Sequence, residues 1–237
     1  MKLYWILLAI GAVLLCLYIR AKLKKYDVKE LLLKTFTSVC FMFVAIFLAY
    51  LIPWGTPARA FAFFVIGGLL MGLLGDVWLD LKYVYPKDDK TYTFAGFYSF
   101  FAGHVLFILG LILNYGDFSR PAYIIVPIII GFAVGIINGF LGKVMKLDYG
   151  IYRPIVMGYG GILFSMTLLA GSLAWMYDFQ FMTLNFMFVG GVLFLISDLV
   201  LSQTYFAGNE SKGVIIANYL TYYPAQFVIA SSLLFIR

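Results

Sequence analysis

Residues 67–80 read GGLLMGLLGDVWLD and place the carboxylate of Asp76 inside an apolar run long enough to cross a membrane. A second stretch, GGVLFLISDLVLS at residues 190–202, carries Asp198 in the same way. In both stretches a Gly-Gly pair and aliphatic residues lead to the acid, and a small residue precedes it directly. A carboxylate is costly to bury in lipid, so such residues usually face a protein interior and have a function there.

The composition around these stretches indicates a membrane protein. The chain has 237 residues, of which 64% are hydrophobic and only 12% charged, too few polar residues to cover a soluble domain of this size. A transmembrane helix needs about 20 apolar residues. Eight runs approach or reach this length: Leu3–Ile19, Leu31–Ile52, Ala60–Leu81, Phe94–Leu113, Ala122–Leu141, Ile155–Met176, Phe181–Leu201 and Val214–Ile236. We therefore expect an all-α polytopic protein, with residues 1–237 forming one eight-helix membrane domain.

The net charge of +6 is explained by topology rather than by nucleic-acid binding. Eight spans put the connectors on alternate sides. One side would carry Arg20, Lys22, Lys24, Lys25, Lys29, Lys34, Lys82, Lys87, Lys90, Lys143, Lys146, Arg153 and Lys212, and the other would carry Lys2, Arg59, Arg120 and Arg237. The positive-inside rule then predicts that both termini lie outside and that the basic connectors face the cytoplasm, next to anionic lipid headgroups.

The two acidic stretches belong to a possible internal repeat. His104 follows Asp76 by 28 residues, and Gln226 follows Asp198 by 28 residues. Their surroundings, FFAGHVLFI and YYPAQFVIA, match in character. The third and seventh spans would also run in the same direction. We therefore predict a parallel repeat of two four-helix halves, a pattern known in membrane proteins.

Glycines recur every fourth residue within two of the spans. They are Gly131, Gly135 and Gly139 in the fifth span, and Gly68 and Gly72 in the third. This spacing lets helix backbones approach closely in lipid. We therefore interpret these glycines as packing residues and assign them no catalytic role.

Polar residues of several spans are predicted to lie at one depth. Asp76 and Asp198 come near the cytoplasmic ends of the third and seventh spans. Lys34 begins the second span, and Asn218, Tyr222 and Gln226 occupy the first half of the eighth. His104 lies nearer the middle of the fourth span. A shared depth is what a common cavity requires, so we expect these residues to surround one.

Each of these residues also has a structural interpretation. Asp76 and Asp198 would then be tied to a lysine or a tyrosine. Asp80 lies one helical turn beyond Asp76 and shares its face, either as a solvated residue or at the rim of the cavity. Lys34 either snorkels to the headgroups or serves as counter-ion to a carboxylate or a lipid phosphate. His104, the one histidine, would be a hydrogen-bonded packing residue.

The residue inventory favours acid–base chemistry without a metal or cofactor. A catalytic zinc site usually takes three protein ligands, which one histidine and two cysteines in apolar helices do not readily supply. The sequence contains neither G-x-S-x-G nor H-E-x-x-H, the motifs of common serine and zinc hydrolases. Two buried carboxylates can share one proton. One then acts as general acid while the other stays ionised, an arrangement suited to acid-labile bonds.

At these residues the chain resembles the YhhN family of integral membrane proteins, which includes the eukaryotic transmembrane lysoplasmalogenases. The resemblance rests on LGDVWL around Asp76, FAGFYSFFAGHVLFI leading to His104, GGVLFLISD around Asp198 and the closing NYLTYYPAQFVIASSL. The order and spacing of these motifs fit from Lys34 to the C-terminus.

The resemblance implies an eight-helix bundle in a bacterial cytoplasmic membrane. It also implies hydrolysis of the vinyl ether bond of lysoplasmalogen, a lysophospholipid, to a fatty aldehyde and a glycerophospho-base. The essential aspartates of the family map onto Asp76 and Asp198. Lys34 would hold the lipid phosphate, and Tyr222 and Gln226 would orient water or the acid.

Two other functions compete with this hydrolase. In a proton- or cation-coupled small transporter, or in a lipid-binding membrane protein, the two aspartates would relay protons or bind cations, and the predicted parallel repeat would suit that role. A non-catalytic structural protein is the third possibility, against which the intramembrane acids argue.

Overall fold

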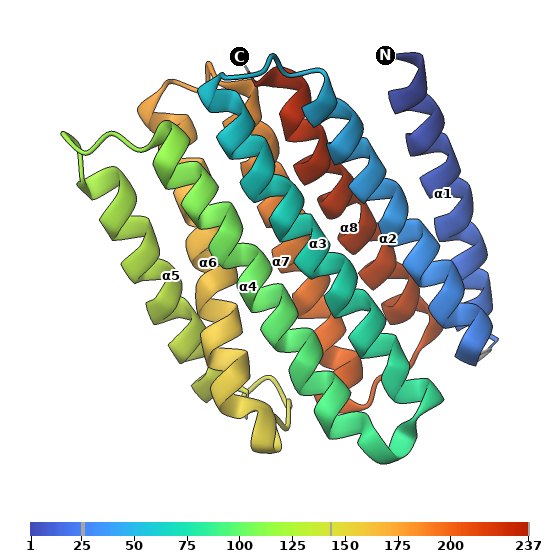
Figure 1. The fold of residues 1–237 in the computed structure, drawn as a ribbon. Coiled ribbons are helices and arrows are strands. Elements are labelled where there is room, and N and C mark those ends of the chain that lie inside the picture. Colours follow the sequence, from blue (N-terminus) through green and yellow to red (C-terminus); the bar gives the residue numbers. More distant parts are fainter. Residues whose placement is uncertain (25–26, 143, 237) are drawn as a thin grey trace.

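The computed structural model describes residues 1–24, 27–142 and 144–236, and within these ranges all regular secondary structure is helical, without a strand (Figure 1). The eight α-helices of the described residues are α1 (Lys2–Lys22), α2 (Asp27–Tyr50), α3 (Pro57–Val84), α4 (Asp89–Tyr115), α5 (Ala122–Leu141), α6 (Arg153–Met176), α7 (Met182–Ala207) and α8 (Lys212–Ser231). Short 3-10 helices cover Pro86–Asp88, Gly150–Tyr152 and Ser232–Phe235. The predicted all-α fold is confirmed.

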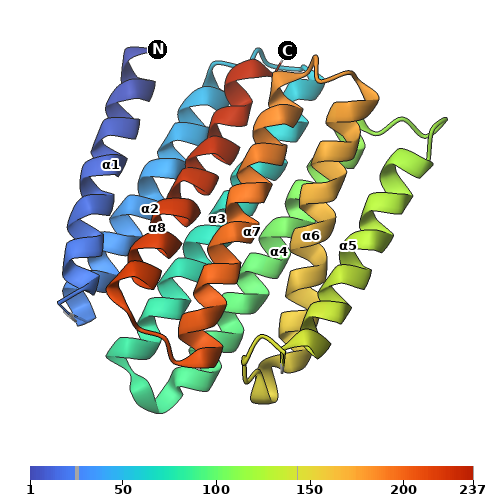
Figure 2. The same cartoon turned by 180° about the vertical axis from the view of Figure 1, so that it is seen from behind.

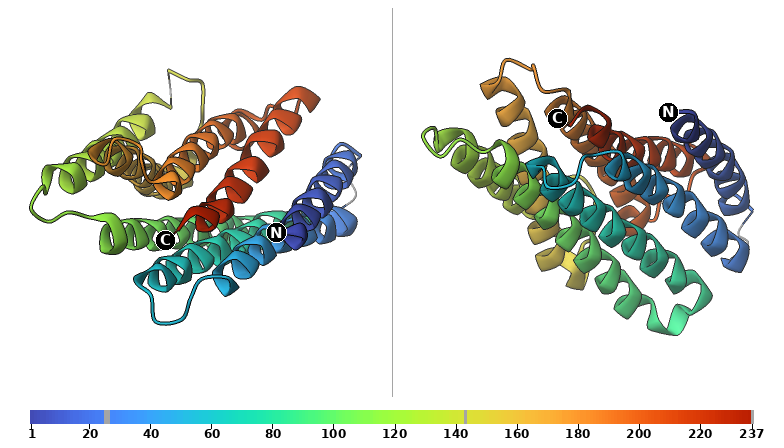
Figure 3. Two further views of the ribbon diagram at one scale, coloured as in Figure 1. Left: turned by 90° about the horizontal axis from the view of Figure 1, so that it is seen from above. Right: turned by 45° about the horizontal axis from the view of Figure 1, so that its top comes forward.

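The helices form two layers that coincide with the two predicted halves. Seen along the bundle, α1 to α4 make one layer and α5 to α8 the other (Figure 3). Between the layers, α4 packs on α6 and α8 packs on α2. A two-fold axis that relates the halves would map α4 onto α8 and α6 onto α2, so it would exchange these two contacts. The layers therefore agree with the proposed repeat, while superposition of the halves stays a prediction.

Seven helices of the described chain, α1 to α7, are long and apolar enough to cross a membrane, as expected of a polytopic membrane protein. Helix α8 runs beside α7 through the bundle (Figure 2) but does not meet the same criteria. Its buried face carries Asn218, Tyr222 and Gln226, which lower its mean hydropathy. The predicted count of eight spans is therefore supported for seven of them.

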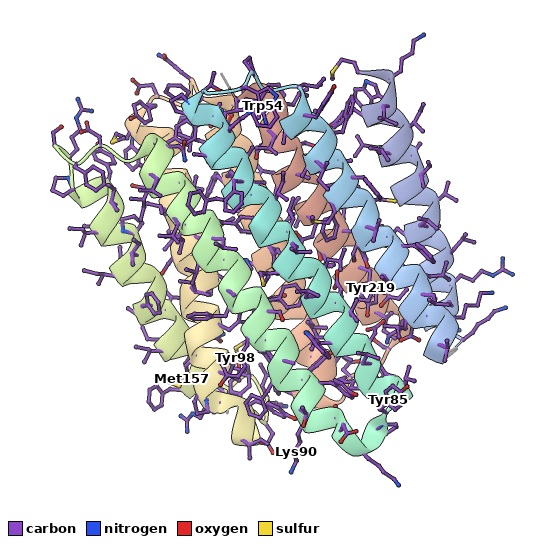
Figure 4. All side chains as sticks on the ribbon, in the orientation of Figure 1. Trp54, Tyr85, Lys90, Tyr98, Met157 and Tyr219 are labelled. Carbon is purple, nitrogen blue, oxygen red and sulfur yellow. The ribbon has the colours of Figure 1, made fainter. Side chains whose placement is uncertain are left out.

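The two ends of the bundle differ in charge. Both termini lie at one end (Figures 1 and 2), where Arg59 stacks on Trp54 with its guanidinium carbon 3.6 Å from the ring centre. Figure 4 labels Trp54 at this end and Lys90 at the other. The opposite end collects the basic residues at the end of α1 and α3 and at the start of α2, α4, α6 and α8. Lys25, Lys143 and Arg237 lie outside the described residues.

Glycines bring neighbouring helices into backbone contact. A Cβ atom added at Gly135 of α5 would lie 2.2 Å from the backbone nitrogen of Gly161 in α6, and one at Gly131 would lie 2.3 Å from that of Ser165. Real Cβ atoms do not approach backbone so closely, so only glycine fits at these positions. The predicted packing role of these residues is confirmed.

Candidate active site

One cavity joins most of the predicted site residues. It has a volume of about 100 Å³, and its walls come from α2 to α8 in the half of the bundle farther from the termini. Lys34, Asp76, Asp198, Asn218 and Tyr222 all line it. These side chains come from four helices and line one cavity, as expected from their similar depth along the helices.

Asp76 is enclosed by groups that compensate a negative charge. The residue is 2% exposed. One carboxylate oxygen accepts hydrogen bonds from the hydroxyls of Ser38 at 2.6 Å and Tyr222 at 2.8 Å, and the other lies 3.5 Å from Lys34 Nζ. Gln226 Nε2 donates in turn to the Tyr222 hydroxyl at 3.0 Å. A buried carboxylate with a cation and two donors is well accommodated in its ionised form.

Lys34 is shared between two carboxylates. Its Nζ lies 3.0 Å from Asp80 Oδ1 as well as 3.5 Å from Asp76 Oδ1, and Lys34 is 4% exposed. It therefore does not snorkel but acts as a buried counter-ion. Asp80 is 2% exposed and also accepts a hydrogen bond from Tyr18 at 3.4 Å. Both expectations for Asp80, a solvated residue or one at the cavity rim, are wrong, because partners from α1 and α2 draw it into the core.

Asp198 has a different environment from Asp76. Tyr159 of α6 donates a hydrogen bond to its carboxylate, and part of Asp198 remains exposed. Within the described residues, no lysine or arginine forms an ion pair with it. Beside it, Asn218 Nδ2 donates to both the carbonyl and the hydroxyl oxygen of Ser197 at 3.0 Å and ties α8 to α7. The two aspartates thus have separate partners, and a shared proton stays a prediction.

His104 lies behind the cavity wall rather than on it. It is 1% exposed, and its Nδ1 lies 2.7 Å from the carbonyl oxygen of Phe100. Because a carbonyl only accepts, Nδ1 carries the hydrogen and Nε2 has a free lone pair, for which the described residues provide no donor. The ring packs edge-on against Phe194 and Tyr159, with centres 4.9 and 5.9 Å away. This agrees with the hydrogen-bonded packing residue anticipated from sequence.

The predicted repeat allows the surroundings of the two aspartates to be compared position by position. Asp76 and Asp198 are 122 residues apart, and the same shift maps Lys34 onto Val156. Val156 lines the same cavity as Asp198 but carries no charge. Among the described residues, Asp76 therefore has a cationic partner and Asp198 has none.

Several partners of the site were not predicted. Ser38 follows Lys34 by one helical turn and so shares its face, a signal that was present in the sequence. Tyr159 precedes Asp198 by 39 residues, much as Ser38 precedes Asp76 by 38, so the repeat also indicates it. Tyr18 comes from α1, and neither helical spacing nor the predicted repeat indicates it in the sequence.

The site lies within a known family pattern. The sequence model of the YhhN family matches residues 29–233. The chain belongs to the YhhN family. The matched range runs from α2 to the 3-10 helix after α8 and contains every side chain that lines the cavity, whereas α1 lies before it. Comparisons with curated proteins and with solved structures gave no match.

Proposed function

We propose that this YhhN-family protein is a membrane-embedded, lysoplasmalogenase-like hydrolase. It would cleave the vinyl ether bond of lysoplasmalogen and release a fatty aldehyde and a glycerophospho-base. The observation that carries the proposal is one cavity with two intramembrane carboxylates, of which Asp76 has a counter-ion and Asp198 has only a tyrosine. Membership of the family supports the same reaction class.

Asp198 is the proposed general acid. A carboxylate without a cation is far less costly to bury when it is protonated. Its exposed part faces the cavity, where a substrate would lie. A vinyl ether is hydrolysed by protonation of the double-bond carbon that does not carry oxygen. The proton of Asp198 would form this C–H bond, and the oxygen-bearing carbon would become an oxocarbenium ion.

Asp76 is the proposed electrostatic partner. Held ionised by Lys34, Ser38 and Tyr222, it would stabilise the oxocarbenium ion, as a carboxylate does in many glycosidases. Water would add to the cationic carbon and return a proton to Asp198, which restores the acid. The resulting hemiacetal transfers its hydroxyl proton to the glycerol oxygen and separates into aldehyde and alcohol.

The proposed orientation follows the distribution of charge. With the basic end of the bundle in the cytoplasm, both termini lie outside, and the cavity lies in the cytoplasmic half of the membrane. Lysolipids in the cytoplasmic leaflet would then lie at the same depth in the membrane as the cavity. Lys34 serves as the counter-ion of Asp76 in this proposal, so the lipid phosphate is left nearer to the membrane surface.

The test is aldehyde release by the purified protein from lysoplasmalogen, alongside fatty acid release from ordinary lysophospholipids. Asp76→Asn and Asp198→Asn should each lower aldehyde release by about 100-fold or more, the usual range for a general acid. Asp178→Asn is the matched control, because Asp178 is exposed in a left-handed turn, with φ 51°, that asparagine tolerates. A wild-type protein inert on every lipid would reject the hydrolase and favour the transporter alternative, whereas full aldehyde release by both variants would reject the aspartate mechanism.

A further inference from the structure

The two aspartates differ in access as well as in charge. Ser38 covers Asp76 from α2 and donates to it at 2.6 Å. The 122-residue shift that relates the aspartates maps Ser38 onto Gly160. Gly160 lines the cavity together with Asp198. Asp198 receives its donor from the residue before Gly160, Tyr159, so position 160 itself adds no side chain to the cavity.

Packing does not account for glycine at this position. A Cβ atom added at Gly160 would meet only the Cα of Gly135, at an ordinary 3.7 Å. At the next residue, Gly161, a Cβ atom would lie 2.8 Å from the ring of Phe132, so that glycine is needed for the contact with α5. Gly160 is therefore a cavity-lining position with room for a side chain, rather than a glycine required by a close helix contact.

Part of the cavity wall is accessible from outside the bundle. The wall includes Phe164 of α6, Leu195 and Leu199 of α7 and Asn138 of α5. Leu199 is 45% exposed, and the other three are partly exposed. The cavity that contains Asp198 is thus lined by apolar residues of α6 and α7 that are also accessible at the outside of the bundle.

We propose that this side of the cavity is the entrance and binding subsite for the unbranched hydrocarbon chain of a membrane lipid. Gly160 is the residue that keeps it open. The inference rests on the proposed function for the identity of the lipid. The double bond of a vinyl ether begins the hydrocarbon chain, so a chain lying between α6 and α7 brings its first carbons to Asp198. The chain remains in an apolar environment throughout its entry.

The experiment compares Gly160→Leu with Gly158→Leu. Gly158 lies on the same helix, does not line the cavity, and has no atom within 4 Å of an added Cβ. The probe is saturated lysophosphatidylcholine with a sixteen-carbon chain, which has no vinyl ether, and its affinity is measured by titration calorimetry in detergent. Gly160→Leu should bind roughly tenfold more weakly or worse, the usual scale for filling an apolar pocket. Gly158→Leu should bind like the wild type.

Each outcome separates this inference from the proposed function. Wild-type affinity in a folded Gly160→Leu variant overturns the chain subsite, whatever the catalytic result. Weakened binding together with a wild type that releases no aldehyde supports the subsite and rejects the hydrolase. If thermal unfolding shows that Gly160→Leu is not folded, Gly160→Ala replaces it. The alanine variant should weaken the sixteen-carbon probe more than an eight-carbon one, and equal effects on both would overturn the subsite.

Discussion

Lys34 Nζ lies 3.5 Å from a carboxylate oxygen of Asp76, and both residues are almost completely buried. The lysine reaches this place from the first turns of α2, and its second contact, at 3.0 Å, is with Asp80. Two carboxylates and one ammonium therefore share a site that water hardly reaches. Such a cluster depends on all its members, because removal of one leaves another buried charge without a partner.

Lys34→Met should destabilise the protein by about 3–5 kcal/mol, since Asp76 and Asp80 would lose their common cation. The measurement is chemical or thermal unfolding in detergent, with Lys90→Met at an exposed site as the control. The double variant Lys34→Met, Asp80→Asn should recover part of the loss because it removes one of the unpaired charges. Equal stability of Lys34→Met and wild type would contradict the ion-pair cluster.

Tyr159→Phe should lower kcat for aldehyde release while KM changes little. The variant keeps the ring but removes the hydrogen bond that orients the Asp198 carboxylate. Asp198 becomes charged as it gives up its proton in the proposed reaction, and hydrogen bonds to charged groups contribute about 1.5–3 kcal/mol, which corresponds to roughly tenfold or more in rate. Tyr177→Phe is the control, because its hydroxyl bonds to the carbonyl of Tyr115 at 3.2 Å at the other end of α6. A drop in KM alone, or equal effects of both variants, would count against a positioning role for Tyr159.

Gly135→Ala should destabilise the contact between α5 and α6, because the new methyl group would meet the backbone of Gly161 at 2.2 Å. Overpacking of this kind typically costs about 1–3 kcal/mol. Gly158→Ala provides the comparison, since its methyl group would meet no atom within 4 Å. Thermal unfolding of the two variants should therefore differ clearly, and identical unfolding temperatures would show that α5 and α6 separate at little cost.

Cysteine labelling tests the proposed orientation. In a variant whose Cys16 and Cys40 are replaced by alanine, Ser119→Cys lies in the connector between α4 and α5, and Asn209→Cys in the connector between α7 and α8. A membrane-impermeant thiol reagent should label the first in intact cells and the second only after the cells are opened. The reverse pattern would place the termini in the cytoplasm.

The fold was predictable because each helix is encoded by its own run of apolar residues. The exception, α8, shows the limit of that signal, since its tyrosines and amides are buried against the other helices and make the run less hydrophobic. It was also predictable that polar residues of several helices line one cavity, because the depth of a residue in the membrane follows from its distance to the end of its helix.

Contacts between helices were harder to predict. The sequence places Asp80 next to Lys82 and suggests the membrane interface, but the lysine that binds Asp80 is Lys34. Likewise Tyr18 joins the site from a helix outside the family match. Hydropathy gives the depth of a residue but not the rotation of its helix against a neighbour, and that rotation decides which side chains meet.

The pairing of Lys34 with Asp76, and not with Asp198, has a stereochemical consequence in the proposed reaction. With Asp76 as the proposed fixed anion on one side and Asp198 as the proposed proton donor on the other, a planar double bond held between them would present only one of its two faces to the donor. Hydrolysis in heavy water should therefore place deuterium on one face only, and the released aldehyde should be chiral at the carbon beside its carbonyl.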